Sequence, residues 1–354
     1  MRRRFPAPLG ALAVAMLVVW RTAAPTSGQT ALKAGTTAET KPAAKAKAAG
    51  GAKREFLTSW GEPDLQGIWS NATTTPLERP SGLAEKDLLS EDEKSEQDEQ
   101  TAERLNTDRR DGAGTDVDVD RAYNNFWWER GKSIGRTSLI VDPLDGRIPP
   151  LTPEGQRRAD AVAAARREHG PADSWEDRNL HERCLVYHAV PPLPTGYNNN
   201  YQIVQTHEYV AILSEMIHEV RLIPLDGRPH LGQSIRQWFG DSRGHWEGHT
   251  LVVDTTNFTD LNDLNQRIRR GSGATLHVVE RFTRVDADKI DYQFTVDDPA
   301  TFTRPWTATL PMAKIPGPIY EYACHEGNYG MSGILAGHRA QEATAAQAVK
   351  KEPK

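Results

Sequence analysis

The stretch from Thr195 to Phe258 consists of short apolar runs, each of which is followed by a turn signal. The runs 201–205, 210–213, 220–223 and 251–254 are four or five residues long, which is the length of strands rather than of helices. A series of short strands with little between them is typical of antiparallel sandwiches and barrels. This stretch is therefore expected to form the centre of a β-rich domain.

More strand signals lie on both sides of this stretch. Residues 276–284 and 290–296 predict a hairpin, and residues 305–312 and 319–324 predict two further strands. Residues 64–69 predict a turn that leads into a first strand. The pair Gly67-x-Trp69 resembles the start of many lipocalin-type barrels, but a tryptophan that simply fills the core is the favoured explanation. The expected fold is mainly β, an antiparallel β-barrel or sandwich, and a lipocalin-like barrel is favoured.

A few peripheral helices interrupt the strand pattern. Residues 152–169 carry Thr152 before a proline and then an Ala/Arg-rich run, which predicts a helix. Residues 85–105 are charge-rich and contain a capping-box pair, Ser90 and Glu93, so they predict a solvated helix or a mobile insertion. Residues 232–239 are expected to form a short helix.

The two ends of the chain differ in composition from the middle. Residues 1–29 combine the basic run Arg2–Arg4 with an apolar run and small residues, which is the layout of an export signal. A retained N-terminal anchor is the alternative. Residues 30–54 are Ala/Lys-rich and are expected to form a disordered linker, and residues 337–354 are expected to form a polar C-terminal tail. A single β-rich domain is therefore expected over residues 55–336.

Charge and hydropathy exclude some classes of partner. The formal net charge is -5, whereas binding to nucleic acid needs a concentrated basic face. After the signal, no apolar run is long enough to form a transmembrane segment in the mature protein. We expect an exported protein of the periplasm or the extracellular space, with no nucleic-acid partner and an oligomeric state that the sequence leaves open.

The expected export bears on whether the two cysteines form a disulfide. Cys184 and Cys324 are the only pair in the chain, and an oxidising compartment permits a disulfide between them. Such a bridge would join the end of the domain to its middle. The alternative is two separate buried thiols.

Three residues around one expected strand are candidates for catalysis. His218 lies before the strand at 220–223, and Arg228 and His230 lie after it. Two imidazoles near an arginine would suit a ligand with an anionic or carbonyl group, with histidine as acid or base and arginine as charge clamp. His245 is a fourth catalytic candidate. The structural alternative is that Arg228 pairs with Asp226 or Glu219.

Other polar and aromatic side chains of the stretch are candidates for binding a ligand. The amides and phenol of Asn199-Asn200-Tyr201 could contact a polar molecule such as a sugar, although asparagine is also common in turns. Asp241 and Arg243 could bind a ligand or pair with each other. The remaining ligand-binding candidates are Glu215, Trp238 and Trp246.

No cofactor and no metal are expected. The chain contains no G-x-G-x-x-G, no Walker A motif, no C-x-x-C and no haem attachment motif. The histidines of His245-Trp246-Glu247-Gly248-His249 would share one face of a strand and could hold a metal, but Glu-Gly is a turn signal that breaks the alternation. A turn with a solvated His249 is the favoured interpretation.

Several longer motifs resemble a family of uncharacterised exported proteins from soil and other environmental bacteria. They are YQIVQ at 201–205, EMIH at 215–218, IPLDGRPH at 223–230, GHWEG at 244–248 and YEYACHEGN at 320–328. The resemblance covers the chain from about Gly67 to Ala336. It implies an exported bacterial domain, and it implies no activity.

Two functions fit these observations. The first is an exported β-barrel that binds a small molecule. The alternative is a secreted or periplasmic hydrolase or lyase that uses histidine acid–base catalysis on the same scaffold.

Overall fold

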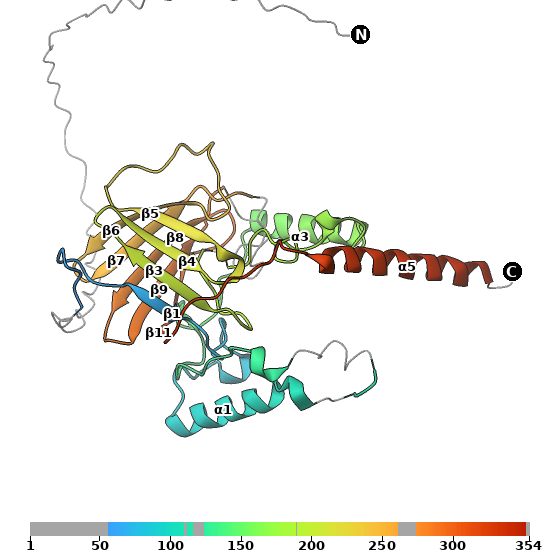
Figure 1. The fold of residues 1–354 in the computed structure, drawn as a ribbon, viewed down its shortest axis with the longest axis horizontal. Helices are drawn as coiled ribbons and strands as arrows, with labels where there is room; N and C mark the ends of the chain where they lie inside the picture. Colours follow the sequence, from blue (N-terminus) through green and yellow to red (C-terminus); the bar gives the residue numbers. More distant parts are fainter. Residues whose placement is uncertain (1–55, 110–111, 116–123, 189, 261–273, 352–354) are drawn as a thin grey trace, which may run out of the picture. The chain divides into compact units, whose positions relative to one another are not determined.

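The computed structural model describes residues 56–109, 112–115, 124–188, 190–260 and 274–351. The chain divides into two units, Met1–Gly50 and Gly51–Lys354. The first unit, which holds the expected export signal and most of the expected linker, lies outside the described residues. Everything below concerns the second unit, which is shown in Figure 1.

Nine strands form one antiparallel sheet that curls into a nearly closed barrel (Figure 1). Its hydrogen-bonded order is β5-β4-β3-β1-β11-β9-β8-β7-β6. The predicted fold class is therefore confirmed, and the barrel alternative is the one observed. The strands are β1 (Gly67–Ser70), β3 (Asn200–Gln205), β4 (Tyr209–Ser214), β5 (Val220–Pro224), β6 (Asp241–Glu247), β7 (Thr250–Thr256), β8 (His277–Arg284), β9 (Lys289–Asp297) and β11 (Met312–Lys314).

The odd number of strands leaves a seam between β5 and β6. Eight antiparallel steps separate these two strands in the sheet, so they run in the same direction. A parallel pair cannot be joined by a tight turn and needs a connection of about a dozen residues or more. Residues 225–240, which we call the crossover, supply that connection.

Side chains close the seam where main-chain bonds do not. A Cβ on Gly244 of β6 would lie 2.8 Å from Ile223 of β5 and 2.7 Å from Leu225 of the crossover. The absence of a side chain at this position therefore lets the two strand edges approach each other. Arg221 of β5 also reaches Ser242 of β6, at 3.4 Å.

The barrel interior is filled along most of its length. Every second residue of β8 and β9 is buried, as expected for strands with one face on a core. The largest fully buried side chains include Trp69, Tyr292 and Phe294, and the rings of the last two are 5.9 Å apart. This interior is a packed core, with a small opening at one end that is described below.

Two short strands extend the sheet, and one expected strand is divided. β10 (Trp306–Thr309) pairs with β9 and with β2 (Ile140–Asp142), and β11 pairs with the other half of β9. Pro311 separates β10 from β11, where the sequence predicted one strand over 305–312. Proline cannot donate to a ladder, so the strand is interrupted there.

Three α-helices accompany the barrel in the described residues: α1 (Glu91–Arg104), α3 (Pro153–Glu168) and α5 (Tyr329–Lys351). Ser90 and Glu93 form the predicted capping box, and Thr152 caps α3 by accepting from the Gly155 amide. The 3-10 turns are η1 (Ser81–Leu83), η2 (Thr107–Arg109), η3 (Asn125–Trp127), η4 (Trp175–Asp177) and η5 (Met216–His218).

Two sequence predictions are wrong. Residues 232–239 form no helix, because the amide of Asn257 donates to the carbonyls of Leu231, Gly232 and Ile235, which a helix would use itself. Residues 319–324 form no strand. The Tyr320 amide donates to the Glu215 carboxylate instead of to a neighbouring strand.

Among the described residues, no helix is both long enough and apolar enough to cross a lipid bilayer.

Candidate functional site

A cavity of about 30 Å³ lies inside the barrel, at the end where β3 begins and β4 ends. Its walls are strand side chains that point inward, and its cover comes from the segment before β3 and from the crossover. The cavity is mostly apolar, but it contains five groups that can carry charge or donate hydrogen bonds. The lining residues are His188, Pro192, Tyr201, Ile203, Ile212, Ser214, Glu219, Arg221, Phe239, Phe282 and Met312.

A buried ion pair forms one wall of the cavity. Arg221 donates from Nη1 to Glu280 Oε1 at 3.1 Å and from Nη2 to Oε2 at 2.5 Å. The Tyr292 hydroxyl donates to the same carboxylate at 2.8 Å. Glu280 has no exposed surface, so its charge depends on these partners. The pair connects β5 with β8 through the barrel interior.

Three buried polar atoms around the cavity have no hydrogen-bond partner. They are Nε2 of His188, Oγ of Ser214 and Nε of Arg221. Each belongs to a residue that lines the cavity. Buried polar atoms in native proteins are almost always paired with protein groups or with ordered water, so a water molecule or another polar group in this space would complete the hydrogen bonds of these three atoms.

Burial keeps His188 and Glu219 neutral near pH 7. It lowers the pKa of His188 to about 4, although the nearby backbone of Asn198 acts in the opposite direction. It raises the pKa of Glu219 to about 8, against the effect of a hydrogen bond from the Tyr187 amide. Because Arg221 and Glu280 neutralise each other, the cavity carries no net charge near neutral pH.

A row of rings leads from this cavity toward the surface. The hydroxyl of Tyr201 and Nδ1 of His188 are hydrogen-bonded at 2.7 Å, and their ring centroids are 5.4 Å apart. Tyr187 follows at 5.2 Å from His188, and His181 at 4.1 Å from Tyr187. Burial lowers the pKa of His181, as it does that of His188. The row connects a half-buried histidine to the barrel interior.

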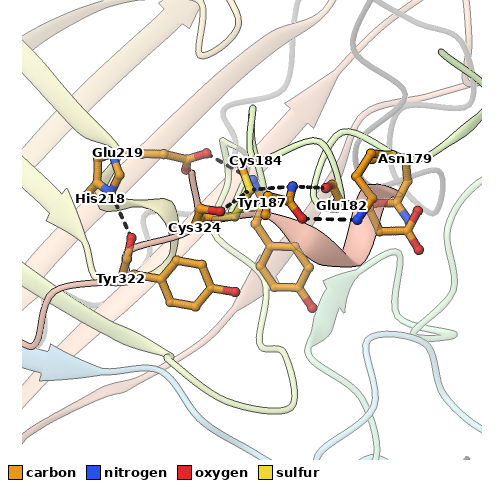
Figure 2. Close-up of a disulfide and its surroundings, with 10 residues drawn as sticks. Asn179, Glu182, Cys184, Tyr187, His218, Glu219, Tyr322 and Cys324 are labelled. Atoms are coloured by element: carbon orange, nitrogen blue, oxygen red, sulfur yellow. Dashed lines mark hydrogen bonds between the residues drawn. A yellow bond between two sulfur atoms is a disulfide. The ribbon is translucent and has the colours of Figure 1, made fainter. Parts of the chain in front are cut away.

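The predicted disulfide fastens the C-terminal segment to this end of the barrel (Figure 2). The Cα atoms of Cys184 and Cys324 are 5.7 Å apart, and 140 residues separate the two cysteines in the chain. His218 Nδ1 donates to the Tyr322 carbonyl at 3.1 Å, as Figure 2 shows. The disulfide thus belongs to the surroundings of the cavity.

Backbone strain is concentrated in the same region. Ile217 and His218, directly before Glu219, have φ angles of 58° and 44°, and Cys184 has φ 54°. Positive φ is unfavourable for residues with a side chain, and most of all for a β-branched residue such as Ile217. Such conformations persist where the surrounding structure enforces them, which is common at functional sites.

The structure separates the predicted catalytic residues. His218 lies before β5, whereas Arg228 and His230 follow it, and a strand of this length spans roughly 16 Å. Arg228 is exposed and pairs with Asp226, which was the structural alternative. His245 is also exposed, 3.3 Å from Glu247 on the same strand. No common centre contains all four residues.

The predicted ligand-binding residues divide in a similar way. Tyr201 lines the cavity, and Asn200 donates to Glu215 at 2.7 Å close by. The Asn199 side chain is used in a turn with Thr195. The other four lie elsewhere: Trp238 packs against Leu180 and Val186, Trp246 packs on the barrel core, and Asp241 and Arg243 pair with each other at 2.6 Å on the outer face.

Sequence reasoning did not identify His188, Glu219, Arg221 or Glu280. A signal was present for two of them. Glu280 alternates with Val278 and Phe282, and Arg221 alternates with Ile223, so period-2 spacing places both charges on inward faces. His188 lies in an irregular segment, where no periodic pattern indicates which way a side chain points.

Comparison with models of protein families, with curated proteins and with solved structures found no match to this chain.

Proposed function

We propose that the protein binds a small, uncharged organic molecule at this end of the barrel. The observation that carries the proposal is the convergence of His188 Nε2, Ser214 Oγ and Arg221 Nε, all unpaired, on one largely apolar cavity. A ligand with a hydrogen-bonding group would satisfy these atoms. The cavity itself holds only a group the size of a hydroxyl, so the apolar part of the ligand would occupy space that Pro192 and Phe239 now cover, and these covering segments would move when the ligand binds.

The charge of the cavity supports a neutral ligand. His188 and Glu219 are uncharged near pH 7, and the Arg221–Glu280 pair has no net charge. A charged ligand would lose its hydration without gaining a counter-ion. A space of about 30 Å³ accommodates a group of the size of a water molecule, such as a hydroxyl. An alcohol or a phenol therefore fits better than a carboxylate.

Export belongs to the same proposal. The basic residues Arg2–Arg4, the apolar run that follows them and the resemblance to exported proteins support it. The Cys184–Cys324 disulfide is compatible with an oxidising compartment. A bacterial envelope protein that binds a small environmental compound would combine these properties.

Calorimetric titration with two probes of similar size tests the ligand class. Cyclohexylmethanol should bind, and cyclohexanecarboxylate should bind at least about tenfold more weakly, because its charge has no partner. Ser214→Val, which fills the cavity with a methyl group, should abolish binding of the alcohol. Equal affinity for both probes, or unchanged binding in Ser214→Val, would contradict the proposal.

A further inference from the structure

A second group of titratable residues lies on the outer face of the barrel. We call it the outer-face cluster, and its members are His230, Asp241, Arg243, Asp254 and His277. In the register of β6, β7 and β8, Ser242, Thr255 and Val278 point inward, so their neighbours Asp241, Asp254 and His277 point outward. None of the five residues lines the cavity inside the barrel.

Asp254 holds two imidazoles at once. Its Oδ1 is 2.9 Å from His230 Nε2, and its Oδ2 is 2.9 Å from His277 Nε2. The other nitrogen of His230, Nδ1, is hydrogen-bonded to Asp241 Oδ2 at 3.0 Å. Asp241 also pairs with Arg243 at 2.6 Å. Both ring nitrogens of His230 are thus within hydrogen-bond distance of a carboxylate, so the ring is held in place between Asp241 and Asp254.

His277 differs from His230 in having one ring nitrogen left over. Its Nε2 donates to Asp254, and among the described residues no hydrogen bond is made by its Nδ1. The neutral ring therefore presents the lone pair of Nδ1. An imidazole oriented by a carboxylate in this way is the arrangement that enzymes use for general bases. The hydrogen bond that His277 donates to Asp254 also raises the pKa of His277.

A groove of about 590 Å³ lies beside this histidine. That volume is in the range of small-molecule sites. Carboxylate side chains are missing from its described lining, whereas an exposed arginine, Arg236, is present. The residues that line the groove are His230, Leu231, Gln233, Arg236, Thr256, Asn257, Ala274, Thr275, Leu276, His277 and Pro299.

We propose that the groove is a second small-molecule site, in which His277 takes a proton from the bound molecule and Arg236 stabilises the negative charge that is left on it. Asp254 is a positioning residue, because it acts through His277. The substrate class is a neutral molecule with an acidic hydrogen. The groups that face His277 are Asp254 from β7 and Asp297 from β9, and His230 of the crossover shares Asp254 with it.

The elimination of 5-nitrobenzisoxazole by the full chain tests the base directly. The base takes the hydrogen on carbon, the C–H electron pair forms the nitrile, and the N–O bond breaks to leave a coloured phenolate. We expect a saturable rate that increases with pH as His277 loses its proton. His277→Gln should lower this rate by about tenfold or more.

Two further variants separate a catalytic role from a structural one. Asp254→Asn should move the inflection of the pH–rate curve to lower pH, because the carboxylate that raises the pKa of His277 is gone. His249→Gln removes an exposed histidine from the β6–β7 turn and should leave the rate unchanged. A rate that His277→Gln leaves intact, or that falls equally in His249→Gln, would overturn the proposal.

Discussion

Arg221 on β5 and Glu280 on β8 meet inside the barrel through two hydrogen bonds between guanidinium and carboxylate. They are 59 residues apart in the chain, and they lie on strands from opposite sides of the seam. Each is the main partner of the other's buried charge. Their contact therefore makes the barrel sensitive to the loss of either residue.

Removing one member of this pair should destabilise the protein strongly. Arg221→Met leaves the Glu280 carboxylate buried without its counter-ion, which costs about 3–5 kcal/mol. The double variant Arg221→Met/Glu280→Leu should lose less of the free energy of unfolding than Arg221→Met alone, because no uncompensated buried charge remains. Urea unfolding measures both free energies. If the double variant is less stable than Arg221→Met, the cost of Arg221→Met does not come from an unpaired carboxylate at Glu280.

Glu219 should make stability fall as pH rises. Its folded pKa of about 8 exceeds the ordinary value of 4.5, so the unfolded chain loses the proton first. The stabilising contribution is complete below pH 4.5 and is lost as pH rises to about 8, with a slope of up to about 1.4 kcal/mol per pH unit. Glu219→Gln should flatten this decline. Thermal unfolding of both proteins between pH 6.5 and 8 shows whether it does.

His188 should make stability fall as pH decreases, which is the opposite of the effect of Glu219. Its folded pKa of about 4 lies below the ordinary value of 6.5, so the unfolded chain takes up the proton first. Its contribution is complete above pH 6.5 and is lost as pH falls toward 4. In the Glu219→Gln background, stability should therefore decrease from pH 6.5 to pH 4.5. A flat profile in that window would show that His188 is not buried in its neutral form.

Loss of the disulfide should loosen the segment around Cys324. Cys184→Ser/Cys324→Ser opens a loop of 140 residues, and the loss of a native disulfide costs roughly 2–5 kcal/mol. The Tyr320 amide, which donates to Glu215, should exchange its hydrogen faster than in the parent protein. The Val253 amide, in the middle of the β7 ladder, serves as the internal control. Equal acceleration at both amides would indicate global rather than local loosening.

A side chain at Gly244 should destabilise the protein. A Cβ there would overlap Ile223 and Leu225 across the seam, and overpacking of this kind costs about 1–3 kcal/mol. Gly232→Ala is the matched control, because nothing lies within 4 Å of its added Cβ. Chemical denaturation of the two alanine variants should show a lower free energy of unfolding for Gly244→Ala only.

Much of the barrel was predictable because strand signals are local. The hairpin of β8 and β9 follows from the alternation of buried residues and from turn residues between the strands. The seam was not predictable in this way, because it depends on the number and order of all pairings. A helix over residues 232–239 of the crossover was predicted wrongly, because the side-chain amide of Asn257, more than 20 residues further along the chain, donates to carbonyls of this segment.

The site was less predictable than the fold. Spacing placed His218, Arg228 and His230 around one strand, but a strand keeps its two ends apart. Tyr201 was identified from its polar neighbours, whereas its partner His188 lies in a segment without a periodic pattern. Glu219 attracts attention only through its burial, which is a property of the folded chain.

The seam also determines how the barrel can deform. Each neighbouring pair in the sheet is joined by main-chain hydrogen bonds except β5 and β6, so the barrel behaves mechanically as a split ring. Widening at the split breaks no ladder, whereas widening elsewhere breaks several bonds. Phe239, on the crossover that spans the split, also covers the cavity. A molecule too large for the closed cavity would reach it at the lowest cost through this gap.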